Sequence, residues 1–148
     1  MNQLATHRVD FYVLDNTHEL STLKTVCKLV EKAYQQNHTI LILTENASMS
    51  DKLNQLLWTY SDTSFIPHSN NPADTVPILI CVKTQDSISL TDYEILINVS
   101  TQFPDNFQKF QRVVEIVDGT PENKQTARMK YKMYREKQCQ LFSHQIIS

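Results

Sequence analysis

Glycine is almost absent from this sequence, and the shortage excludes several kinds of phosphate-binding and hydrolytic site. Gly119 is the only glycine among 148 residues, whereas a typical composition of roughly 7% would give about ten. A phosphate-binding P-loop needs two glycines before its lysine, and a dinucleotide-binding fingerprint needs three. The nucleophile elbow of an esterase needs two. None of these motifs can form here.

Paired cysteines and long apolar runs are missing as well. The three cysteines lie far apart and form no C-x-x-C motif, so neither a disulfide framework nor a zinc site is predicted. The longest apolar run, residues 78–82, is five residues long, against the roughly 20 that a membrane span needs. Residues 1–10 contain no apolar secretory segment. We therefore expect a cytoplasmic protein that needs no metal or cofactor and does not contact a membrane.

The spacing of apolar residues predicts strands that alternate with helices. Short apolar or β-branched runs predict strands at 9–14, 39–43, 78–82, 94–99 and 113–117. Apolar residues at steps of three and four predict three helices. The first covers 19–36, the second runs from a cap near Ser48 or Asp51 to about 60, and the third runs from a cap at Thr120 to about 142. One or two helical turns are also predicted at 104–110. This order predicts a single α/β domain over residues 1–148, in which helices pack on a mostly parallel sheet.

Catalytic side chains do not form a recognisable set. No two of the five histidines are three or four residues apart, so no helix presents a paired metal site. His7 and His144 are expected in terminal tails, and a loop hydrogen bond is favoured over a catalytic role for His68. Cys27, Cys81 and Cys139 are expected to pack as buried thiols. Cys139 follows a basic helix and is expected to be the most reactive of the three.

The basic residues are concentrated near the C-terminal end. Residues 121–148 carry a net charge of +4 and residues 1–120 a net charge of −6. At 100° per residue, four side chains fall within about 60° on one helix face and a fifth lies at its edge. These are Lys124, Arg128, Tyr131 and Arg135, with Lys132 at the edge. The stripe is either a solvated face or a site for an acidic ligand with an apolar end, such as an acidic peptide or nucleic acid.

A second candidate surface contains aromatic residues. Trp58 points away from the direction in which Leu56 and Tyr60 pack on the predicted helix, and Phe65 follows shortly after. Trp58 is therefore either a core residue or a hydrophobic anchor for a partner helix, because tryptophan is enriched at the centres of protein interfaces.

Four segments together resemble one known family, the chi subunits of bacterial DNA polymerase III holoenzyme. The segments are F-Y-V-L-D-N (11–16), L-L-W (56–58), S-F-I-P-H (64–68) and K-Q-T-A-R-M-K-Y-K-M-Y-R (124–135). The resemblance implies a three-layer Rossmann-like sandwich without a nucleotide-binding loop. It also implies a non-catalytic replisome adaptor, an accessory subunit without an active site of its own.

The resemblance further implies partners and the residues that bind them. The acidic C-terminal tail of single-stranded DNA-binding protein would bind at Lys124, Arg128, Tyr131, Lys132, Arg135 and Val117. The psi subunit, which leads to the clamp loader, would bind at Trp58 and Phe65, as would a DinG-like helicase. DNA would be contacted only indirectly. The loop 69–77 lacks the glycines common there in the family, which leaves its part in psi binding open.

A different class of function remains as the alternative. A small Rossmann-like enzyme that binds a nucleotide or nucleic acid would suit the same alternation of strands and helices. The single glycine and the lack of a nucleophile–base pair favour the adaptor over the enzyme.

Overall fold

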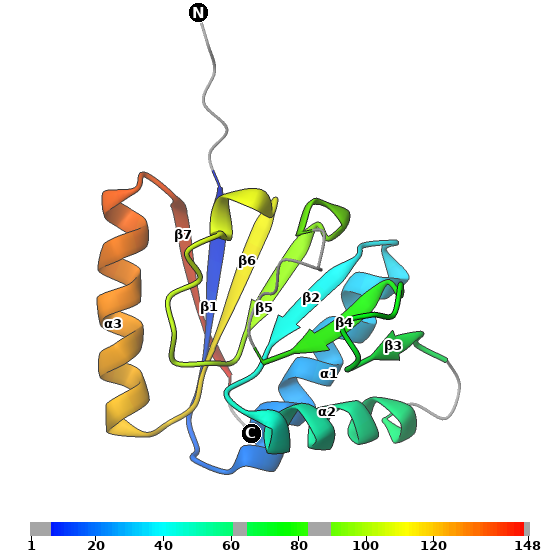
Figure 1. The fold of residues 1–148 in the computed structure, drawn as a ribbon. Helices are drawn as coiled ribbons and strands as arrows, with labels where there is room; N and C mark the ends of the chain where they lie inside the picture. The colour runs from blue at the N-terminus through cyan, green and yellow to red at the C-terminus, as the bar shows by residue number, and fades with distance from the viewer. Residues whose placement is uncertain (1–6, 61–64, 83–89, 147–148) are drawn as a thin grey trace, which may run out of the picture.

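The described residues form seven strands and three α-helices, with two short 3-10 helices, arranged as in Figure 1. The structure is a computed structural model that describes residues 7–60, 65–82 and 90–146. The elements are β1 (Arg8–Leu14), α1 (Glu19–Gln35), β2 (Ile40–Leu43), α2 (Ala47–Thr59), β3 (His68–Ser69), β4 (Ile78–Cys81), η1 (Leu90–Asp92), β5 (Ile95–Asn98), η2 (Phe107–Lys109), β6 (Arg112–Val117), α3 (Pro121–Glu136) and β7 (Gln140–Ile146).

The strands form one open sheet in the order β3-β4-β2-β5-β6-β1-β7. Every strand pairing is parallel. Helices α1 and α2 lie on one face and α3 lies on the other, which gives three layers (Figure 1). The predicted α/β sandwich with a mostly parallel sheet is therefore confirmed. Because the strands are parallel, their carboxyl ends all meet at one edge of the sheet.

The central strands are the ones that the sequence predicts most clearly. All four residues of β2, β4 and β5 are buried, and their sequences are I-L-I-L, I-L-I-C and I-L-I-N. Alternate residues of each strand belong to two different apolar clusters, one under α1 and α2 and the other on the α3 side. A strand that is covered on both faces needs apolar residues on both faces, which explains why these runs show no polar alternation.

The end of the last helix differs from the prediction. Helix α3 ends at Glu136 rather than near Phe142, and Gln140–Ile146 forms strand β7 beside β1. The chain leaves the helix at Gln138, whose φ of 65° is left-handed, and the N–H groups of Lys137 and Cys139 donate to carbonyls of the last turn. As a consequence, His144 lies in a strand and not in a tail.

Smaller differences concern caps and a short strand. The side chain of Asn46 caps α2 by accepting a hydrogen bond from the N–H of Met49, so the predicted cap at Ser48 or Asp51 is wrong. Thr120 caps α3 as predicted, with Pro121 at the first turn. Strand β3 was not predicted because it has only two residues.

Gly119 occupies a tight turn between β6 and α3. Its N–H donates to the carbonyl oxygen of Asn16, 2.7 Å away, and a Cβ at this position would lie 2.8 Å from that oxygen. Any other residue would push the two chain segments apart. The single glycine therefore allows a close backbone contact at the carboxyl edge of the sheet.

Asp10 is a buried carboxylate that joins three neighbouring strands. It lies on β1 and accepts hydrogen bonds from Arg8 and, across the sheet, from Arg112 of β6, and it is 2.9 Å from Nε2 of His144 on β7. Burial by itself would raise the pKa of Asp10, but hydrogen bonds from Arg8, His144 and Arg112 outweigh it and hold that pKa below its usual value.

We expect the stabilisation by Asp10 to depend on pH. Because its pKa is lowered on folding, Asp10 stabilises the fold above its unfolded-state pKa of about 3.9, and this contribution is lost as the pH falls through the lower folded-state value. Asp10→Asn should cost about 2 kcal/mol in urea unfolding at pH 7 and clearly less at pH 3. Asn in place of the exposed Asp105 is the control. An equal cost of Asp10→Asn at both pH values would contradict this role.

Candidate functional site

A groove lies between α3 and the strands beneath it, with a volume of about 410 Å³. Its apolar floor includes Phe11 and Val13 of β1 and Val117 of β6. The Tyr131 ring forms part of its wall and lies 5.5 Å from the Phe11 ring, centre to centre. The groove can therefore hold an apolar group the size of an aromatic side chain.

Cationic and polar groups surround this floor. Lys124 and Arg128 line the groove from α3, and Ser143 and Gln145 line it from β7. In the described part of the chain, no carboxylate lies within 4.0 Å of a charged nitrogen of Lys124, Arg128, Lys132 or Arg135. The rim can therefore bind an anion without first breaking an ion pair.

The structure brings together most of the residues predicted for this site. Val117, Lys124, Arg128 and Tyr131 line the groove, whereas Lys132 and Arg135 are exposed on α3 outside it. Sequence reasoning missed Phe11, Val13, Ala127, Ser143 and Gln145. Ser143 and Gln145 could not be placed because they follow the predicted helix, in a region expected to be a terminal tail, and the residues of β7 show no clear polar–apolar alternation that would signal a strand.

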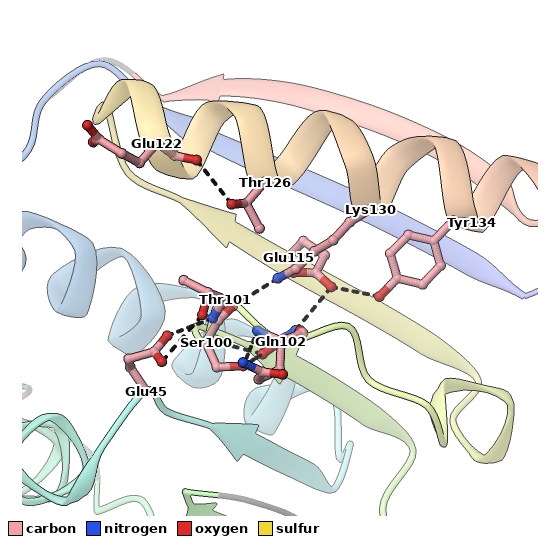
Figure 2. Close-up of polar contacts among 10 residues, drawn as sticks. Glu45, Ser100, Thr101, Gln102, Glu115, Glu122, Thr126, Lys130 and Tyr134 are labelled. Atoms are coloured by element: carbon pink, nitrogen blue, oxygen red, sulfur yellow. Dashed lines mark hydrogen bonds and ion pairs between the residues drawn. The ribbon is translucent and has the colours of Figure 1, made fainter.

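A buried polar network fixes α3 to β6 and to the segment that follows β5 (Figure 2). Lys130 is buried, and its Nζ lies 3.0 Å from Oε1 of Glu115 and 2.8 Å from the carbonyl oxygen of Ser100. The hydroxyl of Tyr134 donates to Oε2 of Glu115 at 2.6 Å, and the amide of Asn98 donates to the same oxygen. Helix α3 is thus held by two specific side chains one turn apart.

Burial affects the titration of both acidic groups in this network. Burial raises the pKa of Glu115, although the attraction of Lys130 and the hydrogen bonds that Glu115 accepts act to lower it. It also raises the pKa of Tyr134, whose hydroxyl faces the Glu115 carboxylate. The phenol therefore stays protonated and remains a hydrogen-bond donor to Glu115.

A second surface lies at the far end of the sheet, beside β3. The rings of Trp58 and Phe65 lie 5.2 Å apart, and the two residues are 53% and 63% exposed. The Trp58 ring also packs on His68, whose Nδ1 and Nε2 lie within hydrogen-bond distance of the carbonyl oxygens of Ile66 and Asn54. Trp58 is therefore not a core residue, and His68 supports it from below. Ser64 of the S-F-I-P-H motif lies outside the described residues.

The three cysteines do not contribute a reactive group. Burial raises the pKa of Cys27 and of Cys81 to about 12, and it also raises the pKa of the partly buried Cys139. The basic helix therefore does not activate Cys139, although Lys137 opposes the rise.

A second hollow, of about 320 Å³, lies at the carboxyl edge of the sheet, where α/β proteins often bind nucleotides. Four carboxylates line it: Glu19, Glu45, Glu115 and Asp118. Glu45 accepts the backbone N–H of Thr101, and Asp118 accepts hydrogen bonds from Thr120 and Asn123. The lining holds four carboxylates against one lysine, Lys130, and this excess of negative charge disfavours a phosphate group.

The fold and the groove define an α/β sandwich protein that offers binding surfaces rather than a phosphate-binding loop. Residues 7–142 match the family described as "DNA polymerase III chi subunit, HolC". The chain belongs to this family, and its role is accordingly that of an accessory subunit of the replication machinery.

Individual relatives cover nearly the whole chain. The chain is 30% identical to the DNA polymerase III subunit chi of Pseudomonas aeruginosa over 140 residues, which cover 94% of this chain and 96% of that protein. It is 32% identical to the Escherichia coli subunit over 132 residues, which cover 84% and 88% of the two chains. It is 25% identical to the Haemophilus influenzae subunit over 126 residues, which again cover 84% and 88%.

No helix in the described ranges is long and apolar enough to cross a membrane.

Proposed function

We propose that this protein links single-stranded DNA-binding protein to the polymerase III clamp loader. In this proposal the groove beside α3 binds the acidic C-terminal tail of single-stranded DNA-binding protein, and the Trp58–Phe65 surface binds the psi subunit. The observation that carries the proposal is the groove itself, since it combines an apolar floor with a cationic rim that no described carboxylate neutralises.

The tail that the family resemblance implies ends in phenylalanine after several aspartates. The phenylalanine ring would rest on Val13 and Val117 beside Tyr131, all of which line the groove. Arg128 would hold the terminal carboxylate, because a guanidinium can donate two parallel hydrogen bonds to it. Lys124, at the rim, would attract the aspartates.

Lys132 and Arg135 have a more distant part in this arrangement. Both are exposed on α3, outside the groove, so they can act on the tail only through longer-range attraction that salt screens. They would raise the rate of encounter more than they would stabilise the bound peptide.

Calorimetric titration with an acidic peptide ending in phenylalanine tests the proposal. Binding should be saturable and should weaken as salt is added. Two control peptides separate the ring from the charge, one lacking the final phenylalanine and one with an amidated C-terminus, and both should bind at least about tenfold more weakly. Equal binding of all three peptides would show that the stripe is only a general cationic surface.

The Trp58–Phe65 surface has the character of a protein–protein anchor. Two large rings stand exposed side by side and one of them rests on a buried imidazole, so their positions are fixed before a partner arrives. A psi helix would cover both rings, and a DinG-like helicase would compete for the same surface. The neighbouring loop is ordered by hydrogen bonds such as that from Ser69 to Asp74, without any glycine.

Trp58→Ala should weaken psi binding by about 2 kcal/mol or more, because it removes an exposed aromatic anchor. It should leave tail-peptide binding and the melting temperature nearly unchanged, since the two surfaces lie at opposite ends of the sheet. The measurement is a titration of each variant with psi and with the tail peptide. Met129→Ala, which removes an exposed side chain of α3, is the matched control. Loss of both activities together with a lowered melting temperature would contradict the assignment.

We further propose that the chain has no nucleotide chemistry of its own. The carboxylate-lined hollow at the sheet edge and the single glycine support this proposal. Saturable binding of ATP or NAD to the purified chain would contradict it.

A further inference from the structure

One part of the sheet is not covered by any described helix. Helix α3 and the loops that contain η1 and η2 contribute to the apolar cluster on one face of the sheet. On the other face α1 and α2 pack over the strands from β6 to β3 and over the ends of β1 and β7 at Leu14 and Ile146, but no described helix lies over the rest of β1 and β7 on this side (Figure 1). We call this region the open face and define it by Arg8, Asp10 and Tyr12 of β1 with Phe142 and His144 of β7.

One exposed and two half-buried aromatic rings lie on the open face. Phe142 is 37% exposed, and the Arg8 guanidinium lies over its ring at 4.5 Å. The neighbouring rings of Tyr12 and His144 stack at 4.5 Å with an angle of 20° between their planes. The fold does not require an exposed phenylalanine here, and neither proposed binding surface uses Phe142.

Cations outnumber anions when the open face is taken together with its margin, where Arg112 of β6 and Lys32 of α1 lie. The carboxylate of Asp10 on this face is fully buried beneath Arg8 and Arg112, whose side chains are 46% and 34% exposed. Each arginine keeps an Nη1 group without a hydrogen-bond partner in the described part of the chain. Lys32 of α1 lies beside Arg112 along a small groove at the margin. The nearby Glu94 lies 3.4 Å from His38.

We propose that the open face binds single-stranded nucleic acid. Exposed arginines over and beside aromatic rings on an open sheet provide both of the contacts that a single strand needs, since bases stack on rings and guanidinium planes and phosphates pair with the cations. An acidic peptide would satisfy the cations but would leave the rings without stacking partners. The occupant that suits both features is therefore a nucleic acid strand.

The location of this face supports the same conclusion. Strand β7 carries Ser143 and Gln145 toward the groove and Phe142 and His144 toward the open face, because successive side chains of a strand point to opposite sides. A protein held at the groove by a DNA-coated partner would bring the open face close to that partner's DNA. The inference does not depend on tail binding, however, and it can be tested without the tail peptide.

Fluorescence anisotropy of a labelled oligothymidylate of 20 nucleotides, titrated with the purified chain, tests the proposal. We expect saturable binding. The logarithm of the association constant should fall linearly with the logarithm of the salt concentration, with a slope of about −2, which corresponds to three phosphate contacts at about 0.7 each. Phe142→Ala should weaken binding at least about fivefold through loss of one stacked base. Lys32→Ala should make this slope shallower by about 0.7, because one phosphate contact is lost.

Matched variants separate this face from the rest of the surface. Met129→Ala, which removes another exposed apolar side chain, and Lys52→Ala, which removes an exposed lysine of α2, should leave oligonucleotide binding unchanged. Arg128→Ala should also leave it unchanged while weakening tail binding about 30- to 150-fold, so failure of either proposal can be seen independently of the other.

Three outcomes would overturn the inference. The first is no binding of the oligonucleotide at 100 µM protein in low salt. The second is binding that Arg128→Ala removes and Phe142→Ala does not, which would place the strand on α3. The third is equal binding of a polyglutamate peptide with the same dependence on Lys32, which would make the open face a site for acidic polypeptides.

Discussion

Replacing Arg128 by alanine is expected to weaken binding of the tail peptide by about 2–3 kcal/mol, or about 30- to 150-fold. Arg128 lines the groove between the apolar floor and the cationic rim, with Tyr131 and Lys124 beside it. It is therefore the cation placed to meet a carboxylate whose adjoining ring fills the groove. The measurement is a calorimetric titration of wild type and variant at two salt concentrations.

Two further variants show whether geometry or charge alone is responsible. Arg128→Lys keeps the charge but loses the two-pronged hydrogen bond, and it should also bind clearly more weakly than wild type. Lys132→Ala, outside the groove, should cost less than about 1 kcal/mol. If Arg128→Ala binds like wild type, or if Lys132→Ala costs as much, the peptide does not occupy the groove as proposed.

Lys130→Met is expected to lower the free energy of unfolding by about 3–5 kcal/mol. Lys130 and Glu115 are both buried, with 7% and 1% of their side chains exposed, and the variant leaves the Glu115 carboxylate without its cation. Glu115 would then have to be protonated or to remain charged in the protein interior, and either costs free energy. Urea unfolding at pH 7, followed by circular dichroism, measures the loss.

The matched control removes both charges while keeping the hydrogen-bond acceptor. In Glu115→Gln/Lys130→Met, the amide oxygen can still accept the hydroxyl of Tyr134 and the amide of Asn98. Most of the lost stability should return, because no unpaired charge remains in the core. If the double variant is no more stable than Lys130→Met, the ion pair is not what the single variant disrupts.

The parts of the fold that sequence predicts well are those in which one physical requirement dominates. Strands β2, β4 and β5 are buried on both faces, and no other secondary structure would bury their short apolar runs as completely. The cationic stripe follows from the period of the helix alone, whereas the same period left Trp58 either in the core or exposed. For these elements local sequence and tertiary environment agree.

The parts that sequence did not predict depend on long-range contacts. Strand β7 is largely exposed and polar, and it is a strand because β1 pairs with it. Lys130 was not assigned to the stripe or to the core, and only its contact with Glu115, fifteen residues earlier, explains its burial. The apolar floor of the groove comes from β1 and β6, which meet only in the folded chain.

The position of β1 in the sheet has a consequence for how the chain folds. β1 is the first described strand to be synthesised, yet both of its neighbours, β6 and β7, begin more than a hundred residues later. Its partners in the ladder therefore do not exist while most of the chain is being made, and loop closure over that distance must precede any gain from pairing. Such high contact order is typical of slow folding. The N-terminal strand, with its exposed edges, depends on completion of synthesis, so this protein should reach its native state after translation rather than during it.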